Sequence, residues 1–299
     1  MRRSAARLLS AQPQWASVTA GLPVVVGSVE GSGRGLFAVT DIPLTHTPLF
    51  TATPVACHPP LHEELSASTC AACLRSVPRG QRFCCPACAA SPWAKLEGSS
   101  GWRAFEALAR EQRSVFALLA GRHAASCSAG AASPLALDSL CFANLHGATP
   151  AAWEEQYAAL EAALRRTGSE LSWLSLSWFT GVLSRLHLNA FRVDLPRTDV
   201  SSISTLALHA AHGSGTGIYG PLASLLNHDC DPCLDAVWRS GDATVSLVAR
   251  RPISAGEQLT ITYVDSGAPM EERRAELEHG YGFTCRCAMC REEEAEGPM

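Results

Sequence analysis

The spacing of the cysteines constrains the fold of this chain more than any other feature. Thirteen cysteines are present, and most of them lie in two tight clusters. In the second cluster, Cys285, Cys287 and Cys290 form a C-x-C-x2-C run. Three thiolates are one short of a tetrahedral zinc shell, and we expect Cys230 to supply the fourth. Buried apolar thiols are the alternative, but close spacing beside a polar tail disfavours it.

The first cluster consists of Cys70 and Cys73, a gap of ten residues, and then Cys84, Cys85 and Cys88. Two ligand pairs separated by a loop predict a structural zinc site built from four of these thiols. We expect Cys84 and Cys88 to form the second pair, with Cys85 as an alternative to Cys84. Secreted disulfide frameworks are usually short and evenly paired, so the odd total favours reduced thiols and two zinc ions.

The composition is that of a globular protein. A chain of 299 residues with 47% hydrophobic residues suggests one or two domains and a sizeable core. The formal net charge of -4 argues against direct nucleic-acid binding, which needs clustered lysine and arginine, and it favours basic partners. The sequence has no uninterrupted apolar run of about 18 residues, so we expect no membrane span.

The first twenty residues have the composition of an organellar transit peptide. They carry Arg2, Arg3 and Arg7 among serines and alanines, and the first acidic residue is Glu30. This pattern predicts import into a mitochondrion or a plastid, with removal of residues 1–20. The alternative is a disordered basic tail on a protein of the nucleus or cytoplasm.

Several short strands are predicted. Residues 23–29 are rich in β-branched side chains, and a glycine-rich turn separates them from an apolar run at 36–39. This predicts two strands joined by a tight turn. Residues 237–248 predict a β-hairpin, and residues 258–264 predict a further strand.

Between about residue 101 and residue 187 the apolar spacing becomes helical. Residues 150–166 place apolar side chains three and four residues apart, which predicts a helix with one apolar face. Residues 170–188 predict a longer helix whose tryptophans and leucines belong to the core. Residues 196–215 are polar and contain glycine and serine, so we expect a surface excursion there.

Four motifs, in order along the chain, resemble the SET-domain lysine methyltransferases. They are the glycine-rich segment 31–38, Asn-His-Asp-Cys-Asp-Pro at 227–232, Ile-Thr-Tyr at 261–263, and the segment 281–290. The last of these resembles the zinc-binding post-SET segment of that family. The chain departs from the family at Cys233, where an asparagine usually takes part in the polar packing of the core.

The resemblance is to the SMYD-like branch and, within it, to plant trithorax-related SET proteins associated with organelles. The first cysteine cluster is similar to the first half of a MYND finger, whose second half is absent from the sequence. This implies an α+β, β-rich SET fold over residues 21–265. It would contain a zinc insert at 68–98 and a helical insert at 99–188, and a post-SET zinc segment with an acidic tail would follow at 266–299.

The resemblance also implies a reaction and its residues. The family transfers a methyl group from S-adenosylmethionine to a lysine ε-amine of a protein. Tyr263 matches the tyrosine that orients this amine, Tyr281 matches a second position of the lysine channel, and Phe283 matches a ring that stacks on adenine. The donor-binding candidates are Arg34, Gly35, Asn189, Asn227, His228 and Phe283. Without the motifs, Tyr263 would be a buried strand tyrosine and Asn189 a helix cap.

Two functions are compatible with the sequence. One is a protein-lysine methyltransferase whose substrate is a histone or an organellar protein. The other is a catalytically silent scaffold that holds a partner protein through its zinc sites and helices. A scaffold has no chemical need to keep the matched site residues together, so their presence favours the enzyme. The acidic run at 292–296 is interpreted as a solvated chain end.

Overall fold

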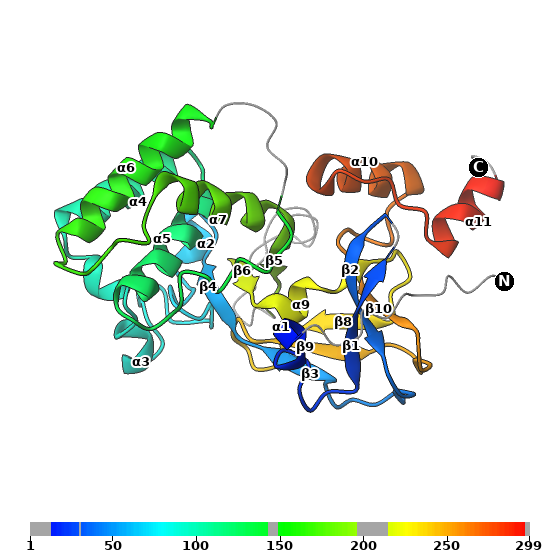
Figure 1. Cartoon of the computed structure of the whole chain (residues 1–299). Helices are drawn as coiled ribbons and strands as arrows, with labels where there is room; N and C mark the ends of the chain where they lie inside the picture. The colour runs from blue at the N-terminus through cyan, green and yellow to red at the C-terminus, as the bar shows by residue number, and fades with distance from the viewer. Residues whose placement is uncertain (1–12, 30, 143–148, 196–214, 297–299) are drawn as a thin grey trace. The chain divides into compact units, whose positions relative to one another are not determined.

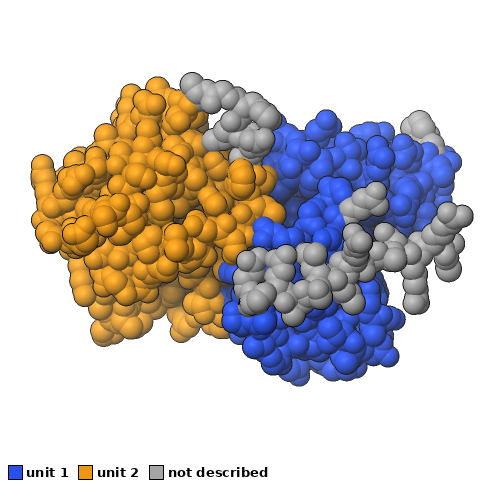
Figure 2. Space-filling view, in the orientation of Figure 1, with its two compact units in different colours: residues 1–52, 221–237, 245–299 blue, residues 53–220, 238–244 orange. Residues whose placement is uncertain are grey.

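The computed structural model describes residues 13–29, 31–142, 149–195 and 215–296. The chain divides into two units (Figure 2). The first unit consists of Met1–Ala52, Pro221–Val237 and Val245–Met299, and the second of Thr53–Gly220 and Trp238–Thr244. The predicted transit peptide, for residues 1–12, and the predicted surface excursion, for residues 196–214, lie outside the described residues.

The first unit contains two small sheets (Figure 1). One has the strand order β1-β2-β10-β7, in which β7 and β10 run parallel and the other pairs antiparallel. The other has the order β3-β9-β8 and is antiparallel. The strands are β1 Val24–Val29, β2 Gly33–Ala38, β3 Phe50–Ala52, β7 Asn227–His228, β8 Leu234–Val237, β9 Val245–Ala249 and β10 Gln258–Ile261.

The two predicted hairpins are confirmed. β1 pairs with β2 from Val24 opposite Ala38 to Val29 opposite Gly33, and β8 pairs with β9. At the first turn Gly31 and Gly33 have φ of 76°, a region where a side chain would be strained. β10 ends before the predicted residue 264, because the Thr262 hydroxyl donates to the Val264 carbonyl at 2.6 Å and the chain leaves the ladder.

The helices of the first unit lie near its chain ends and beside the sheet residues that carry the motifs. They are α1 Pro13–Ala16, α9 Pro221–Ser224, α10 Met270–Tyr281 and α11 Ala288–Glu296. α10 ends in a left-handed cap at Gly282, which turns the chain directly into the last cysteine run.

The second unit is mainly helical and has one antiparallel sheet of order β4-β6-β5. Its strands are β4 Pro54–His58, β5 Ala190–Val193 and β6 Gly215–Tyr219. Its helices are α2 Glu63–Ser66, α3 Pro86–Ala89, the 3-10 helix Ala94–Leu96, α4 Ser100–Glu111, α5 Val115–Ser128, α6 Ala151–Arg165 and α7 Leu176–Asn189.

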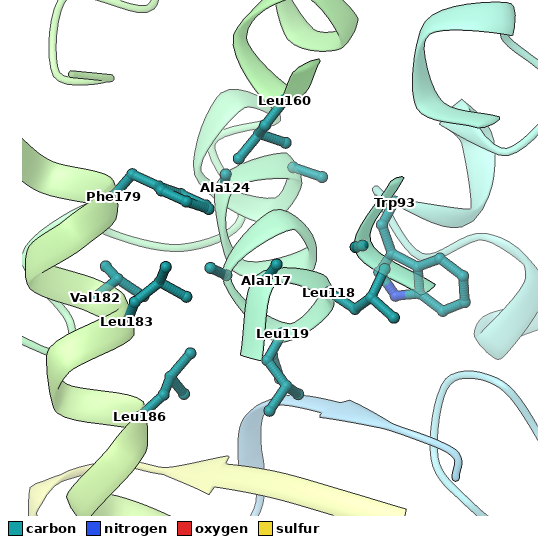
Figure 3. Packing of buried hydrophobic residues seen from close by; sticks show 14 of the residues in the cluster. Trp93, Ala117, Leu118, Leu119, Ala124, Leu160, Phe179, Val182, Leu183 and Leu186 are labelled. Atoms are coloured by element: carbon teal, nitrogen blue, oxygen red, sulfur yellow. The ribbon is translucent and has the colours of Figure 1, made fainter. Parts of the chain in front are cut away.

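The helical prediction holds for α6, whereas the second helix begins later than predicted. α7 starts at Leu176 rather than residue 170, because the Ser175 hydroxyl accepts the Trp178 N–H at 3.1 Å and caps the helix. Figure 3 shows Phe179, Leu183 and Leu186 of α7 facing the apolar side of α5. Trp178 packs against this cluster, which confirms the predicted core role of the aromatic side chains. No helix among the described residues is both long and apolar enough to cross a bilayer.

Candidate active site and metal clusters

Four aromatic rings meet in the first unit, from three segments far apart in the sequence. The Tyr263 ring lies 4.7 Å from the Tyr281 ring and 5.5 Å from the His228 ring, measured between centroids. The Phe283 ring lies 6.1 Å from His228 and 6.4 Å from Tyr281. The structure therefore brings together four of the site residues predicted from the sequence.

Strand pairing explains why His228 reaches Tyr263. β7 lies parallel to β10 with His228 opposite Ile261. Tyr263, two residues after Ile261, therefore lies close to His228. The Tyr263 N–H donates to His228 Nδ1 at 3.1 Å, and His228 Nε2 lies 3.3 Å from the Cys230 sulfur. Because Nδ1 accepts, the neutral ring carries its proton on Nε2, facing the sulfur. Burial lowers the pKa of His228 to about 4, so this neutral form holds at physiological pH.

The Tyr263 hydroxyl has a fixed direction. It donates to the Leu226 carbonyl at 2.6 Å, and Leu226 directly precedes the Asn-His motif. The Tyr281 phenol lies within ring contact of it, and burial raises the pKa of Tyr281, so this phenol stays protonated. Tyr263 thus presents an oriented hydroxyl group, and Tyr281 a neutral one.

Asn227 connects the glycine-rich segment to the same region. Its Nδ2 donates to the Arg34 carbonyl at 3.0 Å. A Cβ on Gly35 would come within 3.0 Å of Asn227 Nδ2 and 2.8 Å of Gln258 Nε2, so this position needs glycine for space. The predicted donor residues Arg34 and Gly35 of β2 thus lie next to Asn227 of β7 in the same sheet.

Asn189, the remaining predicted donor contact, ends α7 in the second unit. Its Nδ2 donates to the carbonyls of Arg185 and Cys141, both at 2.7 Å. Both amide protons are therefore used inside that unit. Asn189 is not part of the aromatic cluster described in the first unit.

The second cysteine cluster has the geometry of a zinc site. The sulfurs of Cys230, Cys285, Cys287 and Cys290 all lie within 4.8 Å of one another. Cys230 is 3.9 Å from Cys285 and 3.6 Å from Cys290. With zinc–sulfur bonds of about 2.3 Å, a tetrahedron has sulfur–sulfur edges of about 3.8 Å. The four thiols predicted from the sequence therefore fit a zinc ion.

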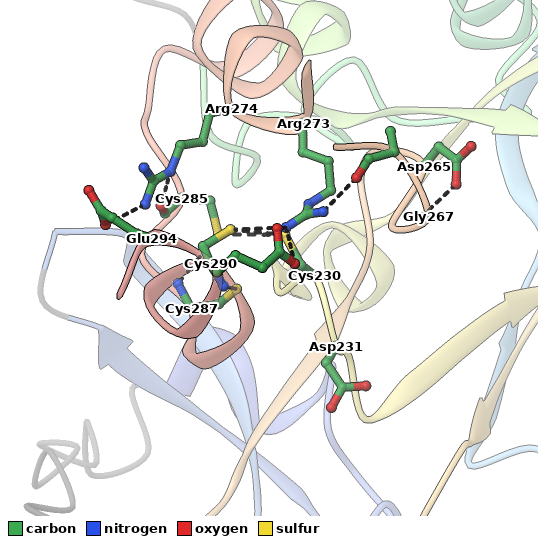
Figure 4. Close-up of polar contacts among 12 residues, drawn as sticks. Cys230, Asp231, Asp265, Gly267, Arg273, Arg274, Cys285, Cys287, Cys290 and Glu294 are labelled. Atoms are coloured by element: carbon green, nitrogen blue, oxygen red, sulfur yellow. Dashed lines mark hydrogen bonds and ion pairs between the residues drawn. The ribbon is translucent and has the colours of Figure 1, made fainter. Parts of the chain in front are cut away.

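Backbone and side-chain donors surround these sulfurs (Figure 4). The Cys287 N–H points to the Cys285 sulfur and the Cys290 N–H to the Cys287 sulfur, each at 3.5 Å. Arg273 Nη2 lies 3.6 Å from the Cys290 sulfur. Burial raises the pKa of the Cys290 thiol, but side-chain hydrogen bonds with Arg273 and the neighbouring cysteines outweigh it and leave the pKa below its ordinary value. By contrast, burial raises the pKa of the Cys230 and Cys285 thiols. A thiolate is the form that binds metal.

The first cysteine cluster forms in the second unit. The sulfurs of Cys70, Cys73, Cys84 and Cys88 lie within 4.8 Å of one another, with Cys84 at 3.5 Å from Cys73 and 3.6 Å from Cys88. Cys85 is exposed and does not belong to this group. Of the two alternatives in the sequence, the geometry selects Cys84.

Cys233 occupies the sequence position where the family usually has asparagine. Its buried sulfur accepts the Thr260 N–H at 3.3 Å and lies 3.6 Å from the Gln258 carbonyl. Burial raises the pKa of this thiol, so it stays protonated and can donate as well as accept. The substitution thus keeps a polar link between the motif and β10.

Two residues of this region are absent from the sequence-based predictions. Trp15 of α1 is 5% exposed, and the Arg34 guanidinium lies 5.0 Å from the centre of its ring. Arg273 is buried in α10. Its spacing of four from Leu277, which is also buried, would have placed it on the inner helix face.

The comparisons with known proteins agree with this geometry. A family model described as SET domain matches residues 33–264. The histone-lysine N-methyltransferase ATXR4 of Arabidopsis thaliana is 30% identical over 90% of this chain and 86% of its own length. A SET and MYND domain-containing protein of Dictyostelium discoideum is 31% identical over 64% of this chain and 56% of its own length.

A shorter match links the chain to animal proteins. The mouse histone-lysine N-methyltransferase SMYD3 is 41% identical over 28% of this chain, and the match spans 19% of the mouse protein. The α+β fold expected from the motifs agrees with the family match and with the mixed sheets and helices. The chain belongs to the SET-domain family.

Proposed function

We propose that this chain is an S-adenosylmethionine-dependent protein-lysine N-methyltransferase. The observation that carries the proposal is the ring cluster of Tyr263, Tyr281, Phe283 and His228 in a chain that matches the SET family. The relatives named as histone-lysine N-methyltransferases support a protein lysine as the methyl acceptor. A histone or an organellar protein is the substrate that we expect.

The residues present fit the methyl donor. When bound, S-adenosylmethionine supplies the methyl group on a sulfonium. The Phe283 ring is 36% exposed although it is anchored beside His228, so it offers a face for adenine. A Cβ at Gly35 would crowd Asn227 and Gln258, so glycine at this position keeps the donor-binding candidates Gly35 and Asn227 side by side.

The two tyrosines supply alignment. The Tyr263 hydroxyl, held by the Leu226 carbonyl, orients the lysine nitrogen, and the Tyr281 ring forms the adjoining wall. The lysine would lose its proton to solvent, because contact with the tyrosine rings and the positive charge of the bound donor both lower its pKa. With the donor bound, the neutral nitrogen would form the new bond to the methyl carbon as the carbon–sulfur bond breaks. The His228 ring already binds a backbone N–H and faces a sulfur, so we assign it a positioning role.

Two variants test this assignment. Tyr263→Phe should lower the methyl-transfer rate about 100-fold, the scale of lost alignment, and leave donor affinity nearly unchanged. Phe283→Ala should weaken donor binding by about 1–3 kcal/mol, the scale of stacking on a base. Tyr157→Phe, which removes a hydroxyl bonded to Glu161 in α6, is the matched control and should change neither.

Calorimetry measures the affinity for the donor, and mass spectrometry of a proteome incubated with enzyme and donor measures methyl transfer. The assignment as a methyltransferase is refuted if the wild type binds no donor, or if Tyr263→Phe transfers methyl groups as fast as the wild type. The scaffold function would then be the better account.

We also propose that each four-cysteine cluster holds one structural zinc. The supporting observation is the tetrahedral spacing of both sulfur sets. In this assignment the post-SET cluster ties the Asn-His motif to the tail that carries Phe283.

For location, we propose import into a mitochondrion or a plastid, supported by the arginine-rich and acid-free start of the chain. Trp15 is buried in the first unit, so cleavage at residue 20 would remove a core side chain. We therefore expect the mature protein to begin before Pro13. N-terminal sequencing of native protein, together with imaging, tests this, and an intact start with nuclear staining would overturn it.

A further inference from the structure

A buried arginine in the second unit has no role in the proposed reaction. Arg122 of α5 is 4% exposed. Its Nη1 donates to the Cys57 carbonyl and, at 2.6 Å, to the Ala71 carbonyl, and its guanidinium lies 3.8 Å from the centre of the Trp93 ring. Among the described residues, no carboxylate lies within ion-pair distance of it.

Arg122 keeps its charge despite this burial. Burial lowers the pKa of the guanidinium to about 10, which still leaves it protonated at neutral pH. Carbonyl groups and an aromatic face stabilise a cation only in part, and a buried charge without a counter-ion is costly. An anion that reached Arg122 would therefore gain a strong and weakly screened interaction.

A cavity of about 260 Å³ opens onto this arginine. Two more arginines, Arg82 and Arg110, line it, whereas Glu63 is its one lining carboxylate. Arg82 binds Glu97 and Arg110 binds Glu106 through Nε and Nη2, and neither glutamate lines the cavity. Within the described structure, the Nη1 groups of both arginines have no recorded acceptor.

The neutral polar side chains that line the cavity donate to backbone carbonyls close to them in the sequence. The Ser66 hydroxyl donates to the Glu63 carbonyl at 3.0 Å, the Thr69 hydroxyl to Leu65 at 2.9 Å, and Gln81 Nε2 to Phe83 at 2.7 Å. Burial lowers the pKa of His58 well below its ordinary value, so its ring is neutral. Within the described lining, the side-chain donors without an acceptor are thus those of the guanidinium groups.

We propose that this cavity binds a small oxyanion, a phosphate or carboxylate group, through Arg82, Arg110 and Arg122. Guanidinium groups match such oxyanions in shape and charge and form paired hydrogen bonds with them. The volume lies just below the usual range for small-molecule pockets and far above that of a single water. A neighbouring cavity of about 280 Å³ also includes Arg122, but its described lining has a single arginine and includes the carboxylate of Asp242.

Thermal unfolding of the zinc-loaded full chain provides the test, with inorganic phosphate or acetate as probe and chloride at equal ionic strength as reference. Phosphate or acetate should raise the midpoint more than chloride does, and the better probe identifies the preferred group. In Arg82→Gln and Arg110→Gln the dissociation constant for that probe should rise about tenfold, the loss of one charge-assisted hydrogen bond.

Arg165→Gln is the matched control, since Arg165 pairs with Glu161 on α6 and does not line the cavity. In this variant, phosphate or acetate should raise the thermal unfolding midpoint by as much as in the wild type. The proposal is overturned if both probes act like chloride, or if Arg82→Gln and Arg110→Gln retain the full response. Methyl transfer does not enter this measurement, so its outcome is independent of the proposed enzyme activity.

Discussion

Two adjacent arginines of α10 allow a direct measurement of how burial changes the strength of an ion pair. Arg273 Nη2 binds both oxygens of Glu293 at 3.0 Å, and its Nη1 donates to the Ala268 carbonyl at 2.6 Å. Arg274 binds Glu294 at 3.0 Å and the Cys285 carbonyl at 3.2 Å. The pairs differ in exposure, because the side chains of Arg273 and Glu293 are 2% and 34% exposed whereas those of Arg274 and Glu294 are 18% and 60% exposed.

The replacement Arg273→Met keeps the apolar stem and removes the charge. Breaking a fully buried pair costs about 3–5 kcal/mol. Glu293 is 34% exposed, so water reaches it after the mutation, and we reduce the expected cost to about 2–3 kcal/mol of unfolding free energy. Arg274→Met should cost much less, and that smaller cost should fade at high salt.

Urea unfolding of the zinc-loaded variants measures both costs. Competition with a chelator measures a second effect, because Arg273 Nη2 also faces the Cys290 sulfur. Loss of such an outer contact typically weakens metal binding about 10–100-fold. Equal losses in the two variants, or unchanged zinc retention in Arg273→Met, would refute the link between this arginine and the cluster.

Other predictions concern the metal content and the pH response. The wild type should contain two zinc ions by elemental analysis, Cys230→Ser should contain one and be much less stable, and Cys85→Ser should keep both. Finding one zinc or none in the wild type would reject this assignment. Burial lowers the pKa of His123 from 6.5 to about 4, so the unfolded chain binds a proton at a higher pH than the folded chain does. His123 should therefore contribute up to about 1.4 kcal/mol per pH unit to the fall in unfolding free energy as pH drops from 6.5 to 4, and His123→Gln should remove that part of the slope in urea titrations.

The cysteine sets could be predicted from the sequence because metal geometry demands short and regular spacings. The structure brings both predicted sets together. The hairpins were predictable for a similar reason, since turn chemistry and β-branched runs are local. The start of α7 was not, because the cap at Ser175 competes with an apolar pattern that extends further toward the N-terminus.

The details of the site depend on contacts between distant segments. The sequence marks Gly35 only as a donor-binding candidate, and the structure adds that a Cβ there would lie 2.8 Å from Gln258 Nε2 and 3.0 Å from Asn227 Nδ2. Nothing in the local pattern says that the His228 ring bonds to the Tyr263 N–H. Trp15 lies in a stretch whose composition resembles a removable leader, and only its burial shows that it belongs to the fold.

The position of Cys230 connects metal supply to catalysis. Cys230 follows His228 by two residues, and Cys285 follows Phe283 by two. One set of thiols therefore holds the segment that carries His228 next to the segment that carries Phe283. In thermodynamic terms, occupancy of the metal site and affinity for the methyl donor are then linked, and each must change the other by the same factor. Under the assignments proposed above, the form without zinc would bind the donor more weakly, and bound donor would strengthen zinc binding by the same factor.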